Sequence, residues 1–156
     1  MAEFTHFKKD GSAVMVDVHE KPDTYRAASA TGTIQVSPEV FAAVRDHTAK
    51  KGDVLGVARL AGIMGAKKNA ELIPLCHIVP LTNCEVTFTT DENTNSITAV
   101  CTTSCVGKTG VEMEALTGVS TALLTIYDMC KAMDRGMVIR DIHILEKEGG
   151  KSGHYI

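Results

Sequence analysis

Asp128 and Lys131, near the end of a long apolar segment, have residue types and a spacing that could support acid–base chemistry. They lie about one helical turn apart, so a carboxylate and an ammonium would face the same side of a helix. Glu114, Thr117 and Thr121 fall on the same third of the circumference. Because the rest of this helix is apolar, the pattern predicts a buried helix whose charges are paired or used for proton transfer. A structural ion pair or a solvated face is the alternative interpretation.

Two further candidates, Lys51 and His77, lie on either side of a Gly-rich segment at residues 54–68. His77 follows Cys76 between two prolines, Pro74 and Pro80, and its apolar neighbours would hold the imidazole in place. The ring could shuttle protons or donate a hydrogen bond to a substrate, or it could be a hydrogen-bonded structural histidine. Lys51 precedes the Gly-rich helix and could contact an anion, whereas most lysines are solvated charges.

Two Gly-Lys sequences could bind phosphate, although neither is a P-loop. Residues 107–109 (Gly-Lys-Thr) and 150–152 (Gly-Lys-Ser) lack the upstream glycine that a P-loop requires. A lysine and backbone N–H groups just before a helix still favour a small phosphate ligand. No metal site is expected, because Cys101 and Cys105 have no matching pair of histidines or cysteines.

The composition limits the class of protein. A length of 156 residues fits one domain over residues 1–156, and 44% hydrophobic with 22% charged residues is typical of globular proteins. A net charge of −3 and the absence of Trp argue against nucleic-acid binding. The apolar stretches are too short to span a membrane. Five cysteines without a C-x-x-C motif, after a polar N-terminus, predict reduced thiols and a cytoplasmic protein.

The chain alternates between strand and helix patterns. Strands are predicted at residues 13–18, 24–36, 82–90, 96–105 and 137–147, and helices at 37–48, 54–68 and 110–135. Ser37 and Asp53 are predicted N-caps, and residues 91–95 have the composition of a hairpin turn. Residues 73–80 are predicted to be irregular. Gly56, Gly62 and Gly65 predict close packing against another backbone.

Without the first strand and the short helix, this order predicts an α+β fold, the ferredoxin-like βαββαβ sandwich. An antiparallel sheet would carry its helices on one face, with the extra short helix and an N-terminal extension. Several strand residues would be apolar on both faces of the sheet, which predicts an oligomer that covers the open face. These residues are Ile97, Val100, Cys101, Val138, Ile139, Ile142 and Ile144.

Several longer motifs resemble those of one known family, cyclic pyranopterin monophosphate synthase, also called molybdenum cofactor biosynthesis accessory protein C. The resemblance covers almost the full chain. Its motifs are MVDV at 15–18, KGDV at 51–54, ARLAGI at 58–63, LIPLCH at 72–77, GKTGVEMEAL at 107–116, LTIYDMCK at 124–131 and GGKSG at 149–153. The chain departs from the family pattern at Ile78, where a proline is usual.

The resemblance implies a lyase of molybdopterin biosynthesis. Its substrate would be a purine nucleotide triphosphate derivative, 3′,8-cyclo-7,8-dihydroguanosine 5′-triphosphate. The products would be cyclic pyranopterin monophosphate and pyrophosphate. The resemblance also implies a homohexamer, a trimer of dimers with active sites at a subunit interface. No resident cofactor is expected, although Mg²⁺ could accompany the triphosphate.

The same resemblance, together with the chemistry above, assigns the candidate site residues. The catalytic candidates are Asp128, Lys131 and Lys51, and the substrate-binding candidates are Leu75, Cys76, His77, Glu112, Met113, Glu114 and Arg26. Glu114 and Asp128 would lie about 21 Å apart on a continuous helix. Either the residues around Glu114 precede the helix and fold back, or the site combines residues from two subunits. A ligand-sensing module and a purely structural subunit are the alternative functions.

Overall fold

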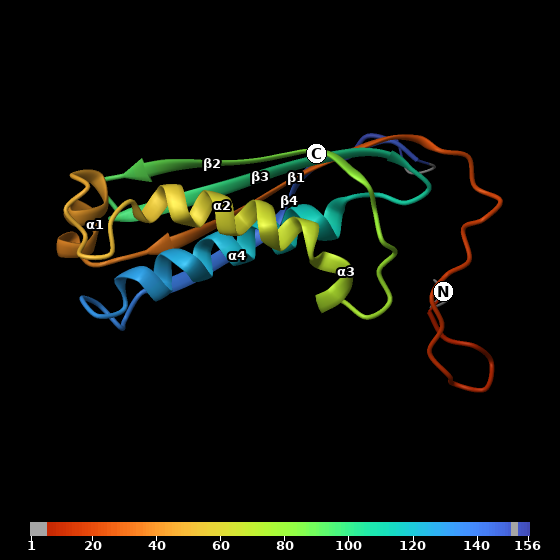
Figure 1. Cartoon of the computed structure of the whole chain (residues 1–156), viewed down its shortest axis with the longest axis horizontal. Coiled ribbons are helices and arrows are strands. Elements are labelled where there is room, and N and C mark those ends of the chain that lie inside the picture. Colours follow the sequence, from red (N-terminus) through yellow and green to blue (C-terminus); the bar gives the residue numbers. More distant parts are fainter. Residues whose placement is uncertain (1–5, 151–152) are drawn as a thin grey trace.

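The computed structural model describes residues 6–150 and 153–156, in which two helices pack on one face of an antiparallel sheet (Figure 1). The strands are β1 (Thr24–Gln35), β2 (Leu81–Asp91), β3 (Ser96–Gly107) and β4 (Val138–Glu148), in the order β2-β3-β1-β4. The packed helices are α2 (Val54–Lys67) and α4 (Glu112–Cys130). The predicted ferredoxin-like sandwich is therefore confirmed. The extra short helix is α1 (Pro38–Arg45), and α3 (Asn69–Leu72) is a single turn that was not predicted.

Local side-chain hydrogen bonds fix the starts of α1 and α2, as predicted. Ser37 Oγ accepts from the backbone N–H of Val40 at 3.3 Å, and Asp53 Oδ1 accepts from that of Gly56 at 2.9 Å. The hairpin turn is closed by Asp91, whose carboxylate accepts from the backbone N–H of Asn93 at 2.9 Å. These bonds set the starts of α1 and α2 and the turn between β2 and β3.

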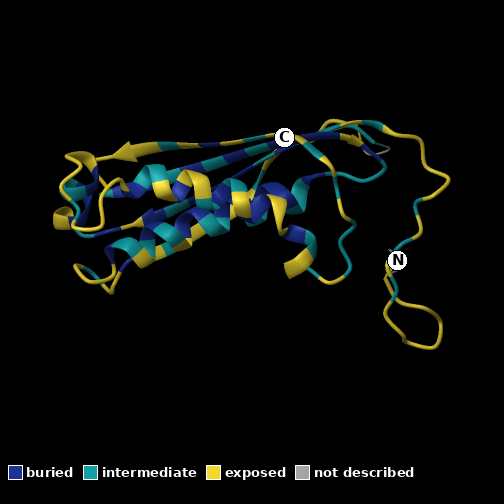
Figure 2. Ribbon diagram, viewed as in Figure 1, coloured by how far each residue is buried: buried dark blue, intermediate teal, exposed yellow. Residues whose placement is uncertain are grey.

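The helices α2 and α4 meet through Gly62 and Gly65 as predicted, whereas the third predicted position, Gly56, lies beside the side chain of Asp53, the N-cap of its own helix. A Cβ atom on Gly62 would lie 3.0 Å from the carbonyl oxygen of Gly118, and one on Gly65 would collide with Thr121. The two backbones can approach closely only because these side chains are absent. Figure 2 shows that buried residues gather where the helices meet the sheet, while much of the outer helical surface is exposed.

The two faces of the sheet differ in polarity, which corrects the expectation that both are apolar. The face under the helices carries buried pairs such as Ile34–Ile97. The open face carries hydroxyl pairs, Ser29–Thr102 and Thr33–Thr98, each joined by a hydrogen bond of 2.9 Å. Strict alternation along β4 would place its isoleucines on both faces of the sheet. A bulge at Asp141, with φ 58°, shifts the alternation, so that the isoleucines of β4 all point to the face that the helices cover. Val100 and Val138 remain on the open face, opposite Thr31 and Gln35.

Two predicted elements are wrong in extent. Residues 13–18 form no strand beyond an isolated bridge between Phe7 and Ala13, and the carbonyl oxygen of Val16 lies 2.6 Å from His77 Nε2 instead of pairing with another strand. The helix α4 ends at Cys130 rather than near residue 135. The Tyr127 hydroxyl donates to the carbonyl oxygen of Arg135 at 3.0 Å, which holds the following residues in a turn. Within the described residues, none of the helices is long and apolar enough to cross a membrane.

Candidate active site

Lys51, Asp128 and Lys131 form a charged cluster at the carboxyl end of α4. Lys131 Nζ donates to Asp128 Oδ1 at 2.7 Å. Lys51, from the loop before α2, donates to the backbone carbonyl oxygen of Asp128 at 3.1 Å and lies 3.7 Å from its Oδ2 atom. A cavity of about 400 Å³ adjoins the cluster, and Arg135 adds a third cation to its wall. The structure therefore brings the three catalytic candidates together.

This cluster is exposed in the single chain, which corrects the prediction of a buried charged stripe for Asp128 and Lys131, whereas Glu114 at the other end of the stripe is buried. The side chains of Lys51, Asp128 and Lys131 are 49%, 60% and 53% exposed. Leu124, one turn earlier, is also exposed, because this side of α4 points away from the sheet. The hydrogen bond from Lys131, and the charges of Lys131 and Lys51, lower the pKa of Asp128. Asp128 is therefore a carboxylate at neutral pH.

A basic cavity opens at the other end of α4. Its volume is about 480 Å³, and its charged lining residues are Lys21, Arg26, Lys108, Glu112 and Lys147. Lys147 Nζ donates to Glu112 Oε1 at 3.0 Å, and Arg26 Nη2 donates to the carbonyl oxygen of Lys108 at 3.3 Å. The buried Nε of Arg26 has no hydrogen-bond partner among the described residues. An excess of cations and an unmatched donor fit an anionic group such as a phosphate.

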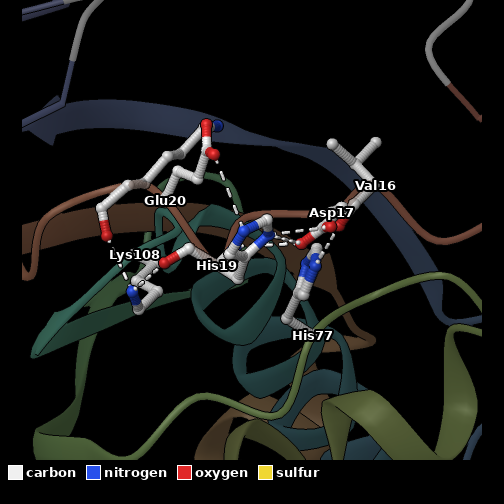
Figure 3. A network of polar contacts seen from close by, with 7 residues as sticks. Val16, Asp17, His19, Glu20, His77 and Lys108 are labelled. Atoms are coloured by element: carbon white, nitrogen blue, oxygen red, sulfur yellow. Dashed lines mark hydrogen bonds and ion pairs between the residues drawn. The ribbon is translucent and has the colours of Figure 1, made fainter.

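His77 lines a second cavity, which shares Lys108 and Thr109 with the basic cavity, and is tied to the N-terminal arm, residues 6–23. Its Nε2 lies 2.6 Å from the carbonyl oxygen of Val16, which can only accept, so Nε2 carries the proton. Lys108 Nζ donates to the carbonyl oxygens of His19 and Lys21 at 2.7 and 2.8 Å (Figure 3). A cavity of about 280 Å³ is lined by both His77 and Lys108. Because Nε2 of His77 carries the proton, Nδ1 is the unprotonated nitrogen of its neutral ring.

The other substrate-binding candidates lie near this end of the molecule. Leu75 and Cys76 are half-buried in the segment before His77, which is irregular as predicted. Met113 is half-buried at the start of α4, next to Glu114.

Glu114 is held inside the protein by two polar side chains. It is only 4% exposed, and Asn69 Nδ2 donates to its Oε1 at 3.0 Å. Thr117 Oγ1 in turn donates to Asn69 Oδ1 at 2.7 Å. Burial raises the pKa of Glu114 against the smaller lowering effect of its hydrogen bonds. This carboxyl therefore keeps a proton to higher pH than an exposed glutamate.

The two groups of candidates lie at opposite ends of α4 (Figure 1). The helix is continuous from Glu112 to Cys130, so residues 112–114 do not fold back toward Asp128. Glu114 and Asp128 are consequently separated by about 21 Å along the helix axis. One chain alone cannot bring both groups to the same small ligand.

Comparison with known proteins identifies the family. The profile of the MoaC family matches residues 15–150. The chain belongs to the MoaC family. It is also 55% identical, over 154 residues, to a cyclic pyranopterin monophosphate synthase from Clostridium botulinum (strain Alaska E43 / Type E3). That alignment covers 99% of this chain and 97% of the relative.

The matched residues, 15–150, include every charged side chain named above for the two clusters, from Lys21 to Lys147. Of the Gly-Lys sequence at 150–152, Lys151 and Ser152 lie outside the described residues. In the described part of the chain, no group of three or more His, Cys, Asp or Glu side chains is arranged to hold a metal ion.

Three residues of these clusters were not singled out from the sequence. Lys147 alternates with Glu146 and Glu148, a pattern typical of a solvated strand end. Lys21 lies in a polar segment, and Asn69 follows two lysines in a stretch with no clear period. Only the fold brings Lys147 to Glu112 and Asn69 to Glu114. Lys108 could be found, because it follows a glycine shortly before a helix.

Proposed function

We propose that the chain is a lyase that converts 3′,8-cyclo-7,8-dihydroguanosine 5′-triphosphate to cyclic pyranopterin monophosphate and releases pyrophosphate. This reaction is a step of molybdenum cofactor biosynthesis. The observation that carries the proposal is the 55% identity to a cyclic pyranopterin monophosphate synthase, over nearly the whole of both chains. The residues of this chain fit the reaction, which needs proton transfers near one cluster and an anion site for the phosphates.

Asp128, Lys131 and Lys51 are proposed as the acid–base group. Asp128 is ionised and accepts from Lys131 at 2.7 Å, so it can orient the ammonium and stabilise its charged form. Lys51 shares the same carboxylate and can neutralise the leaving pyrophosphate or transfer a second proton. A substrate or a second subunit that covers these exposed side chains would exclude water and strengthen their electrostatic contacts with the reacting groups.

The basic cavity is proposed to hold the triphosphate. Arg26 and Lys108 would bind phosphate oxygens, and the unmatched Nε of Arg26 supplies a further donor. His77, which lines the neighbouring cavity that shares Lys108, would position the nucleotide or relay protons through Nδ1. Glu112 and Lys147, already paired at 3.0 Å, can exchange that contact for one with the ligand.

Each active site is proposed to combine the basic cavity of one subunit with the Asp128 cluster of another, within a homohexamer. The separation of the two groups along α4 supports this arrangement. The outer side of the helical layer also exposes a stripe of large apolar side chains. Val57, Leu60, Met64 and Leu124 are 47%, 63%, 43% and 60% exposed. Such a stripe is typical of a surface that packs against another chain.

The protein is proposed to work in the cytoplasm without a resident metal. Its five cysteines are free thiols in the structure, which fits a reducing compartment. Mg²⁺ would enter with the triphosphate and affect turnover only. Chelation with EDTA should therefore leave the melting temperature unchanged. A large drop in melting temperature on chelation would contradict this proposal.

The decisive experiment supplies the upstream cyclised nucleotide to the purified protein and measures the pyrophosphate released. Turnover that yields a cyclic monophosphate product is expected. Tight binding of the nucleotide without product would instead indicate a sensing module, and no binding in native mass spectrometry would indicate a structural subunit.

A further inference from the structure

Two cysteines on neighbouring strands bring their sulfur atoms together. Cys84 of β2 and Cys101 of β3 have Sγ atoms 3.9 Å apart. In the strand register Cys84 faces Thr103 and Cys101 faces Val86, so the two cysteines are diagonal neighbours. Both point to the face of the sheet that the helices cover. The pair has no part in the proposed active site.

The two thiols differ in access and acidity. Cys101 is fully buried, and its sulfur lies against Gly118, where α4 has no side chain. Cys84 is half-buried and lines a cavity of about 330 Å³ together with Lys67. The hydrogen bond from Cys101, helped by the charge of Lys67, lowers the pKa of Cys84. The same bond and burial raise the pKa of Cys101. Cys84 is therefore the thiol that ionises first and that a small reagent can reach.

We propose that Cys84 and Cys101 form a modification site at which a hydroperoxide closes a reversible disulfide. The Cys84 thiolate attacks the peroxide, so an S–O bond forms and the O–O bond breaks. Cys84 is oxidised to a sulfenic acid, and hydrogen peroxide is reduced to water after it takes up a proton. The Cys101 sulfur then attacks that of Cys84. The S–S bond forms, the S–O bond breaks, and the hydroxyl leaves with the Cys101 proton as water. An external dithiol restores both thiols.

The position of β2 permits the movement that this bond needs. The sulfurs must approach from 3.9 Å to about 2.05 Å. Diagonal cysteines require a shift of the backbone to reach disulfide geometry. β2 is an edge strand bonded only to β3, and its pairing is irregular between Leu81 and Asn83, directly before Cys84. The strand can therefore shift without breaking a second ladder.

Peptide mapping of the oxidised full-length protein tests the proposal. Reduced protein is treated with a small excess of hydrogen peroxide, alkylated and digested without reductant. Cleavage at Asp91 and Glu92 separates the two cysteines, which no lysine or arginine does. We expect one linked pair of peptides, Cys84 to Cys101, in a chain about 2 Da lighter that dithiothreitol restores. Loss of the Cys84 thiol without this linked pair, or a link through another cysteine, would overturn the proposal.

Variants separate the roles of the two thiols. With Cys101→Ser the second step is blocked, and dimedone should label Cys84 as a sulfenic acid. In the wild type, Cys84 should react with a neutral alkylating reagent at pH 7 at least about tenfold faster than the half-buried Cys76. Lys67→Gln should reduce that advantage, whereas the neighbouring Lys68→Gln should not. Equal reactivity of Cys84 and Cys76 would refute the assignment, and this measurement does not depend on any variant folding.

Discussion

Asp128 and Glu114 are carboxyls on the same helix, yet their pKa values move in opposite directions. Asp128 is exposed and accepts from Lys131, which lowers its pKa. Glu114 is buried, and the loss of solvation outweighs the bond from Asn69, so its pKa rises. The two residues are therefore suited to different work, because one is a stable anion and the other keeps a proton.

The role proposed for the Asp128 cluster is tested by Asp128→Ala and Lys131→Ala. Removal of a general acid or base typically costs about 10²- to 10⁴-fold in rate, so each variant should lose at least that much turnover. Substrate affinity, measured by calorimetry, should stay within about tenfold, because proton transfer and not binding is removed. Asp46→Ala is the matched control, since Asp46 is also an exposed carboxylate paired with a neighbouring cation, Arg45. Turnover within a few-fold of wild type would make the cluster a surface ion pair only.

Glu114→Gln should change how stability depends on pH. The unfolded chain loses the Glu114 proton near pH 4.3, whereas the folded protein keeps it to higher pH. Raising the pH through this window therefore favours unfolding of the wild type, and ionisation cannot affect the variant. Urea unfolding should show the stability of Glu114→Gln, relative to wild type, rising with pH from about 4.3 and then levelling. Glu39→Gln, exposed on α1, is the control, and a pH-independent difference for Glu114→Gln would contradict the prediction.

Among the elements, the contact between α2 and α4 depends on the absence of side chains at Gly62 and Gly118. At a free helical position, Gly→Ala stabilises a helix by about 1 kcal/mol. In Gly62→Ala the new methyl group would lie 3.0 Å from both the Gly118 carbonyl and Val86, so we expect a net loss of about 1–3 kcal/mol. The urea midpoint measures this loss. Ala61→Gly on the same helix controls for propensity, and a more stable Gly62→Ala protein would show that the interface can relax.

The elements that could be predicted from the sequence are those that local signals define. Caps at Ser37 and Asp53, the turn after Asp91 and the alternation of β2 are all contained in a few neighbouring residues. Residues 13–18 were wrongly predicted as a strand, because the partners of this segment, such as His77, are distant in the chain. The prediction that the open face of the sheet is apolar was wrong, because the bulge at Asp141 shifts the alternation of side chains along β4.

The candidate site shows the same limit. The contact of Asp128 with Lys131 follows from helical spacing, and the structure contains it. The solvent exposure of that pair could not be predicted from the sequence, because helical periodicity does not say which side of an almost wholly apolar helix faces the sheet. Lys147 and Asn69 reach the other cluster only through the tertiary fold.

At the scale of the whole molecule, sites shared between subunits predict complementation. Arg26→Ala and Asp128→Ala proteins should each be inactive, because each removes one half of every site. After subunit exchange in an equal mixture, about one quarter of the sites should contain both intact halves and regain turnover. Activity of the mixture, with exchange followed by native mass spectrometry, measures this. Wild type taken through the same exchange with Asp128→Ala is the control. If the mixture of the two variants regained no turnover although subunit exchange was proven, both halves of the site would lie in one chain.

The strand order β2-β3-β1-β4 also has a consequence for synthesis on the ribosome. β1 is the first strand to be made, yet both of its neighbours, β3 and β4, follow it in the chain. At translation rates of about 5–20 residues per second, β1 waits roughly 4–15 s before β3 has been added. During that interval both of its hydrogen-bonding edges are open to other nascent chains. The hydroxyl-rich side of β1, with Ser29, Thr31 and Thr33, lowers the apolar content that would otherwise promote aggregation on polysomes.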